Sequence, residues 1–207
     1  MLTQAFWTSL RIIAFRAGPE DLPYDAGRVL TSACMAFAVL ANTVLAAMML
    51  GVAPVALKAP LLAAVALAVA TVLALGVFTR FMLRTRQLDN RFQQTFNALL
   101  LTSSVLALAL ALPIHLLAPL LPAVESYVEK VQQHPELAND PSAVPDLPGW
   151  AGVLSLLLPA LFAWQFAVTA YIYRRAANTR TAGGIFIAVL CLLAVTSFKT
   201  LFSVFIH

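Results

Sequence analysis

A few polar side chains lie inside otherwise apolar stretches of this sequence, and these are the residues that could bind or react. Asn42, Ser103 and Gln165 are neutral hydrogen-bonding residues, His115 is the one histidine in these stretches, and Lys199 is the one formal charge. If the stretches cross a membrane, a charge at their centre costs about 2.5–3.5 kcal/mol, so ionisable groups there usually mark a function. These five residues are the candidate polar positions within the membrane.

The same side chains allow two different functions. Neutral polar residues in membranes most often hydrogen-bond between helices, at about 0.6 kcal/mol each. If Asn42, Ser103, Gln165 and Lys199 gathered around one cavity, they would instead line a small channel, a lipid-handling site or a transporter. Lys199 can reach the outer membrane surface with its long side chain. It could instead pair with a lipid phosphate, with the carbonyl of Asn42 or with a partner subunit.

Carboxylates are absent from all five apolar stretches. Proton- and cation-coupled transporters commonly carry a membrane carboxylate that takes the charge of the ion. We therefore do not expect that mechanism for this chain alone.

Sequence motifs of catalysis and metal binding are also absent. The chain has no Gly-x-Ser-x-Gly, no His-Glu-x-x-His and no phosphate-binding glycine loop. Ser155 and His115 come nearest to a hydrolase pair, but neither belongs to a motif. Cys34 and Cys191 lie singly in apolar runs, where cysteine packs as a small buried residue, and zinc needs three or four ligands. We expect no enzyme activity, no cofactor and no metal site.

Long helices must hold these positions. Of the 207 residues, 61% are hydrophobic and only 11% are charged, whereas soluble domains carry about 25% charged residues. A membrane core of about 30 Å is spanned by roughly 20 apolar residues, so the sequence predicts an all-α polytopic membrane protein, with residues 1–207 in a single membrane domain. The alanine-rich second stretch suits a central helix that its neighbours approach closely. The five stretches run over about Val29–Leu50, Ala59–Phe78, Phe96–Leu117, Trp150–Tyr171 and Ile185–Phe205.

The arginines predict the orientation. When the connections are assigned to alternating sides, all ten arginines fall on one side and only Lys58, Lys130 and Lys199 on the other. Because basic residues are retained in the cytoplasm, we expect a multi-pass protein of the cell inner membrane with a cytoplasmic N-terminus and a periplasmic C-terminus. The formal charge of +4 is then a topological signal, and no nucleic-acid partner is expected. The arginines are Arg11, Arg16, Arg28, Arg80, Arg84, Arg86, Arg91, Arg174, Arg175 and Arg180.

Residues 1–18 are expected to form a helix that lies on the inner membrane surface, with Trp7 at headgroup depth. Gly18-Pro19 is expected to end it, and residues 19–28 form an acidic proline linker. The alternative is a cytoplasmic helix packed against the spans. At helical spacing, one side holds Phe6, Trp7, Leu10, Ile13 and Ala14, and the other holds Gln4, Thr8 and Arg11.

The longest connection, residues 118–149, lies on the outer side. Val124, Tyr127, Val128 and Val131 form a short amphipathic stripe, which predicts a helix on the outer face. Four prolines between His134 and Pro148 then predict an irregular tether.

The segment Arg16–Tyr24, R-A-G-P-E-D-L-P-Y, resembles the entry segment of small bacterial inner-membrane members of the Yip family. Five spans, a cytoplasmic N-terminus and a short surface helix are similar to that family as well. The Asp-Leu-Tyr-Gly-Pro type motif of its eukaryotic members is absent, so binding to small GTPases is not carried over. The resemblance implies a non-enzymatic membrane scaffold without a cofactor, often oligomeric or partnered.

Together these features favour a scaffold or accessory subunit of a membrane complex. We expect membrane lipids as partners, together with another membrane protein or a second copy of the chain. Its cytoplasmic interaction surface would include Asp21, Tyr24, Arg84, Arg86, Arg174 and Arg175.

Overall fold

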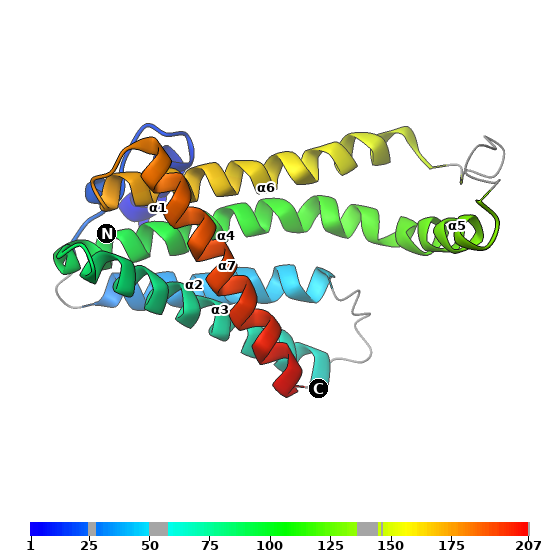
Figure 1. Ribbon diagram of the computed structural model, residues 1–207, viewed down its shortest axis with the longest axis horizontal. Coiled ribbons are helices and arrows are strands. Elements are labelled where there is room, and N and C mark those ends of the chain that lie inside the picture. The colour runs from blue at the N-terminus through cyan, green and yellow to red at the C-terminus, as the bar shows by residue number, and fades with distance from the viewer. Residues whose placement is uncertain (25–27, 50–57, 136–144, 146, 207) are drawn as a thin grey trace.

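The computed structural model describes residues 1–24, 28–49, 58–135, 145 and 147–206. In this part of the chain every regular element is a helix, which confirms the predicted all-α fold (Figure 1). Within the described ranges, five helical segments are long and apolar enough to cross a membrane. The elements are α1 (Leu2–Ile13), the 3₁₀ turn η1 (Pro19–Asp21), α2 (Val29–Met49), α3 (Lys58–Arg84), η2 (Asp89–Arg91), α4 (Phe92–Leu117), η3 (Ala118–Leu120), α5 (Leu121–Gln133), α6 (Gly149–Ala176) and α7 (Thr181–Ile206).

All ten arginines lie at one end of the bundle, which we call the arginine end. It combines α1 with the first turns of α2, α4 and α7 and the last turns of α3 and α6 (Figure 1). Lys58 begins α3 at the opposite end, and Lys130 lies in α5 beyond that end. The predicted separation of arginine from lysine is therefore present in the fold, while the orientation in a membrane stays a prediction.

Four of the five long helices extend past the apolar stretches by more than one turn at the arginine end, and α2 begins at Val29 as the stretch does. α3 continues to Arg84, α4 already begins at Phe92, α6 continues to Ala176 and α7 already begins at Thr181. Hydropathy marks only the part that sits in hydrocarbon, whereas a helix continues as long as its backbone hydrogen bonds do. The predicted spans therefore mark the part of each helix suited to hydrocarbon and not the helix ends, and as membrane boundaries they stay a prediction.

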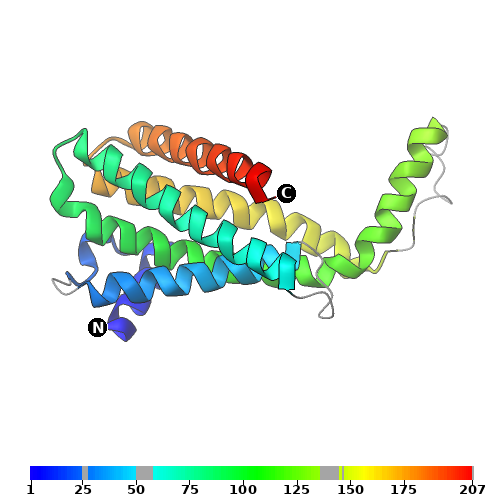
Figure 2. The same ribbon diagram turned by 90° about the horizontal axis from the view of Figure 1, so that it is seen from below.

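At the opposite end, α4 continues through η3 into α5, which turns away from the bundle axis (Figure 2). α5 confirms the helix predicted from the amphipathic stripe. Val124, Tyr127 and Val131 are its least exposed side chains, while Val128 is exposed. Most of the proline-containing tether lies outside the described residues.

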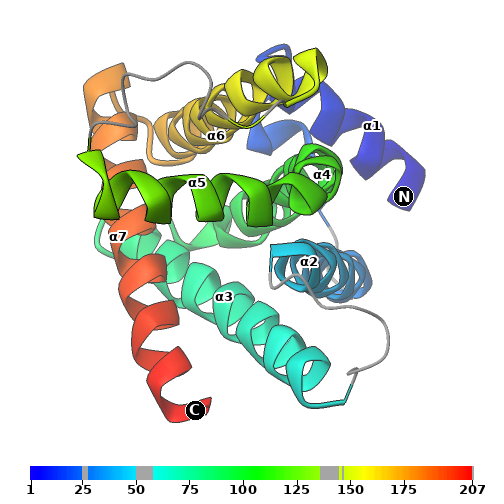
Figure 3. The same cartoon turned by 90° about the vertical axis from the view of Figure 1, so that its right-hand side faces the viewer.

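The five long helices contact one another in the order α2, α3, α7, α6 and α4, and α4 closes the ring on α2. α4 also contacts α1 and α3, so it is the central helix (Figure 3). The alanine-rich α3 was predicted for that place, and this prediction was wrong, since Leu62, Val77 and Phe81 of α3 are exposed. Small and hydroxyl side chains admit close neighbours, and α4 buries Thr95, Ala98, Thr102 and Ser104.

α1 packs against α4 and α6, as the alternative prediction had it. The buried face of α1 consists of Ala5, Thr8, Ser9 and Ile12. Thr8 therefore faces the bundle, whereas it was predicted to lie on the polar side of the helix. The side chain of Trp7 is 62% exposed. An exposed aromatic on the far face of α1 is compatible with a position at the membrane surface, which stays a prediction.

α1 ends at Ile13, before the predicted stop at Gly18-Pro19. The chain reverses at Phe15, whose φ of 58° is left-handed, and the Arg16 amide donates to the Arg11 carbonyl at 2.8 Å. Gln87 after α3 and Asn178 after α6 make the same turn. This turn usually uses glycine, and a bulky residue is a rare occupant, so the residue type at Phe15 did not predict the turn.

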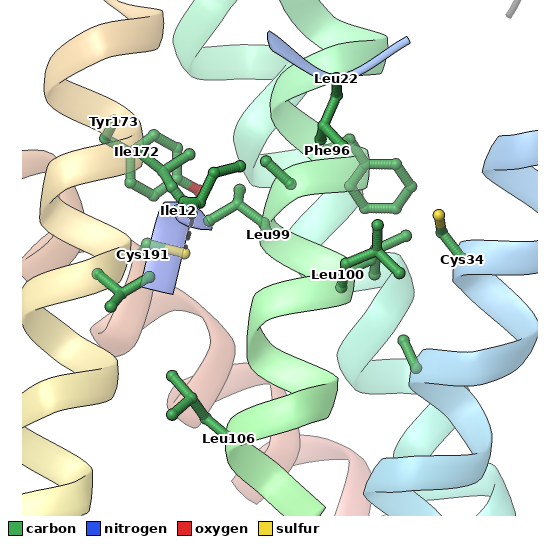
Figure 4. Packing of buried hydrophobic residues seen from close by; sticks show 14 of the residues in the cluster. Ile12, Leu22, Cys34, Phe96, Leu99, Leu100, Leu106, Ile172, Tyr173 and Cys191 are labelled. Carbon is green, nitrogen blue, oxygen red and sulfur yellow. Dashed lines mark hydrogen bonds between the residues drawn. The ribbon is translucent and has the colours of Figure 1, made fainter. Parts of the chain in front are cut away.

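The hydrophobic core joins α1 and all five long helices, with α3 contributing Val72. Figure 4 shows part of this packing. Ile12, Leu100 and Ile172 are fully buried within it. Cys34 and Cys191 are both buried and free, as predicted for small apolar residues.

Candidate functional site

The five candidate polar residues do not line either of the two cavities described below. Asn42 donates its side-chain amide to the Ala38 carbonyl of its own helix at 2.8 Å, and Ser103 donates to the Leu100 carbonyl at 3.1 Å. Gln165 and Lys199 are partly buried, and His115 is exposed in the last turn of α4. Ser155, the possible nucleophile, donates to the Gly152 carbonyl of its own helix at 2.8 Å.

A buried polar contact that the sequence did not reveal joins three helices. The hydroxyls of Thr79 in α3 and Tyr173 in α6 are 2.9 Å apart, and the Tyr173 hydroxyl lies 3.4 Å from the Cys191 sulfur in α7. Tyr173 is 1% exposed and belongs to the buried cluster drawn in Figure 4. Because a buried tyrosine hydroxyl needs a partner, this contact fixes the relative position of α3, α6 and α7.

Asn97 in α4 is a buried polar side chain that, unlike Tyr173, has no partner within the described part of the chain. Its side chain is 0% exposed, and neither its amide nitrogen nor its oxygen has a hydrogen-bond partner among the described residues. An unsatisfied buried amide costs about 1–3 kcal/mol. It lies two residues after Thr95, outside both cavities.

The larger cavity is a groove of about 640 Å³ at the arginine end. It is formed where η1, the start of α4, the end of α6 and the turn into α7 meet. We call it the arginine groove. Its lining residues are Pro19, Glu20, Arg91, Gln94, Thr95, Arg174, Arg175, Ala176, Asn178, Thr179, Arg180 and Thr181.

Hydrogen bonds from the end of η2 and the start of α4 hold the walls of the arginine groove. The Arg91 guanidinium donates to the carbonyls of Arg175 and Ala176, at 3.4 Å each, in the last turn of α6. Gln94 donates to the Leu22 carbonyl at 3.0 Å and thereby ties the linker to α4.

The charge in the arginine groove is strongly positive. Four arginines face one carboxylate, that of Glu20, which forms an ion pair with Arg175. Both side chains of this pair are more than 40% exposed, and exposed pairs contribute little stability. The groove therefore keeps an excess of positive charge that an anion can neutralise.

The predicted cytoplasmic surface is only partly assembled here. Arg174 and Arg175 line the arginine groove, whereas Arg84 and Arg86 are exposed at the end of α3 and do not line it. Asp21 accepts a hydrogen bond from the Gly18 amide at 2.8 Å, which closes η1, and Tyr24 is exposed.

Among the lining residues that sequence reasoning missed as site residues are Glu20, Arg91, Gln94 and Arg180. Two signals could have found them. Arg91 and Arg180 each directly precede a helix that runs into an apolar stretch, and Gln93-Gln94 is a polar pair at the start of such a helix.

An apolar cleft of about 290 Å³ lies directly beside the arginine groove, between α6 and α7. Arg174 and Thr181 line both cavities, and the Arg174 guanidinium donates to the Thr181 hydroxyl at 3.3 Å. The same guanidinium lies over the Tyr171 ring, 5.5 Å from its centroid. The apolar cleft is lined by Phe15, Phe166, Ala167, Ala170, Tyr171, Arg174, Thr181 and Ile185.

No metal-binding group of three or more suitable side chains occurs among the residues that the structure describes. Comparisons with models of protein families, with curated proteins and with solved structures give no match to this chain.

Proposed function

We propose that this membrane protein is a non-enzymatic scaffold or accessory subunit that binds another transmembrane chain through α6 and α7. The observation that carries the proposal is the exposure of these two helices in the half of the bundle far from the arginine end. There, most residues of α6 from Gly152 to Ala163 are exposed, as are most of those of α7 from Leu192 to Leu201.

The chemistry of this surface supports a protein partner. Leu156 of α6 is 74% exposed and Leu193 of α7 is 57% exposed, while Gly152 and Thr196 are exposed beside them. Glycine and hydroxyl residues on a membrane helix let a second helix approach closely. The resemblance to the Yip family from Arg16 to Tyr24 points to the same class of function.

A channel, a lipid-handling protein or a transporter with a polar cavity among the helices is the alternative. The scaffold is favoured because Asn42 and Ser103 bond within their own helices and because neither cavity is lined by Gln165 or Lys199. We place the protein in the cell inner membrane, with the N-terminus in the cytoplasm and the C-terminus in the periplasm, since all ten arginines share one end.

Photo-crosslinking in the native membrane tests the proposal. A crosslinking residue at Leu156 or Thr196 is expected to join the chain to a second copy or to one defined membrane protein. The matched control is Val77 of α3, which is 71% exposed and lies outside the proposed surface. The joined species should also appear at fixed stoichiometry by native mass spectrometry in lipid discs. A chain recovered only as a monomer, or equal crosslinking from Val77, would contradict the proposal.

The orientation needs its own test. A reporter fused after His207 should be active only in the periplasm, and a reporter that is active in the cytosol would overturn the assignment.

A further inference from the structure

We propose that the arginine groove and the apolar cleft together bind one anionic phospholipid, with its phosphate in the groove and an acyl chain in the cleft. This inference is independent of the scaffold proposal, because it concerns the other end of α6 and α7. It rests on three observations: the charge of the groove, the apolar lining of the cleft, and the residues that the two cavities share.

The groove offers what a phosphate needs. Arg175 and Arg180 are exposed and line it with Arg91 and Arg174, and a planar guanidinium donates two parallel hydrogen bonds to a phosphate. The exposed partnership of Arg175 with Glu20 is weak enough for a phosphate to share the guanidinium. A volume of about 640 Å³ lies within the range of ligand sites and has room for a headgroup.

Two further donors lie in the same wall. The Thr179 hydroxyl is buried without a hydrogen-bond partner among the described residues. α7 begins at Thr181, on the groove wall, and the first turn of a helix presents unpaired amides and a partial positive charge. Both features favour an anion in the groove, in addition to the arginines.

The cleft offers what an acyl chain needs. Phe166, Ala167 and Ile185 present an apolar wall, and Phe15 lies over the cleft with its ring 5.2 Å from both Trp164 and Tyr171, centroid to centroid. The shared residues Arg174 and Thr181 make the cleft continuous with the groove. A free phosphate would leave this apolar space empty, so the combination favours a lipid.

The position along the bundle agrees with a lipid headgroup. Arg174 follows the apolar stretch that ends at Tyr171 by three residues, which is about 4.5 Å along a helix. The groove therefore begins where hydrocarbon ends and headgroups begin, and the cleft lies on the hydrocarbon side.

The test uses the purified full-length protein in neutral detergent, titrated with phosphatidylglycerol, phosphatidylcholine or inorganic phosphate. Binding is measured by native mass spectrometry and by the shift in melting temperature. We expect phosphatidylglycerol to bind at least tenfold more tightly than phosphatidylcholine, and inorganic phosphate to bind only weakly. Equal binding of the two lipids, or phosphate binding as tight as phosphatidylglycerol, would overturn the proposal.

Two charge variants separate the groove from general attraction to a basic surface. Arg175→Gln with Arg180→Gln should weaken phosphatidylglycerol binding at least tenfold. Arg84→Gln with Arg86→Gln removes the same charge from the same end, outside the groove, and should change it less than twofold. Equal losses would mean surface attraction only. If the first pair of substitutions prevents folding, the pair Arg175→Lys and Arg180→Lys keeps the charge. It should still weaken phosphatidylglycerol binding severalfold, since lysine cannot donate two parallel hydrogen bonds to a phosphate. Unchanged binding would contradict a groove in which the guanidinium groups hold the phosphate.

A third variant tests the acyl chain. Ala167→Trp fills the apolar cleft and should weaken phosphatidylglycerol binding while leaving inorganic phosphate binding unchanged. The control is Ala163→Trp, on exposed helix surface one turn away and outside the cleft. If Ala167→Trp has no more effect than this control, the site binds the phosphate group alone and the lipid assignment is wrong.

Discussion

The two halves of the α6–α7 pair differ in how closely the helices approach. At the arginine end Gly184 of α7 is buried against α6, and a Cβ at Gly184 would lie 2.6 Å from the Ala170 carbonyl oxygen. Toward the other end α7 crosses away from α6 (Figures 1 and 3), and a Cβ at Gly152 of α6 would meet no heavy atom within 4 Å. One glycine thus sets the closest contact, and the crossing angle leaves the far faces uncovered.

The largest expected effect comes from filling the close contact. Gly184→Val should lower the free energy of unfolding by about 1–3 kcal/mol, because the new side chain overlaps the α6 backbone and the Cβ of Arg174. Gly152→Val, the control in the open half, should change it by less than about 0.5 kcal/mol. Equilibrium unfolding in mixed detergent micelles measures both. Similar losses at the two glycines would break the comparison between the halves.

Removing the unpartnered amide should stabilise the central helix. Asn97→Leu is expected to raise the free energy of unfolding by about 1 kcal/mol, since the buried amide lacks hydrogen bonds among the described residues and leucine keeps the same branched shape without polar atoms. The same unfolding assay reports it, with Asn97→Ala as the variant that leaves a small cavity. A loss of stability in Asn97→Leu would show that the amide has a partner in the membrane.

The contact of Tyr173 with Thr79 and Cys191 tests how much a polar contact stabilises the closely packed half. Tyr173→Phe should lower the free energy of unfolding by about 0.6 kcal/mol, and by no more than about 1.7 kcal/mol, because it removes the hydroxyl that meets Thr79 and Cys191. A double-mutant cycle with Thr79→Val isolates the contact. Strict additivity of the two substitutions would mean that the hydroxyls do not interact.

The smallest effect is expected on the open face. Thr196→Val should change the stability of the isolated chain by less than about 0.5 kcal/mol, because Thr196 is exposed on α7. The same substitution should still reduce crosslinking to the proposed partner in membranes. A destabilised isolated chain would show that this face is already covered within one molecule.

The features that depend on whether a residue suits lipid or water could be predicted from the sequence. Apolar length predicted the long helices, and the segregation of arginine predicted which helix ends lie together. It could not predict that α4 is central, because many apolar faces look alike in lipid and small side chains occur in several stretches.

The candidate site was only partly predictable for a similar reason. Arg174 and Arg175 were recognised as a basic pair, but the groove also needs Arg91, which is brought to them by tertiary packing of α4 on α6. Asn42 was recognised as a polar residue in an apolar run, yet its own helix supplies a carbonyl acceptor. Residue type alone does not say which of these outcomes occurs.

The left-handed turn at Phe15 has a consequence for the order in which the chain assembles. Its aromatic neighbours, Trp164 and Tyr171, are about 150 residues further along the chain. At ordinary synthesis rates they emerge on the order of ten seconds later. The chain therefore completes α1 and its main neighbour α4 before α6 is made, and Phe15 acquires its two ring contacts only in the last stage of assembly.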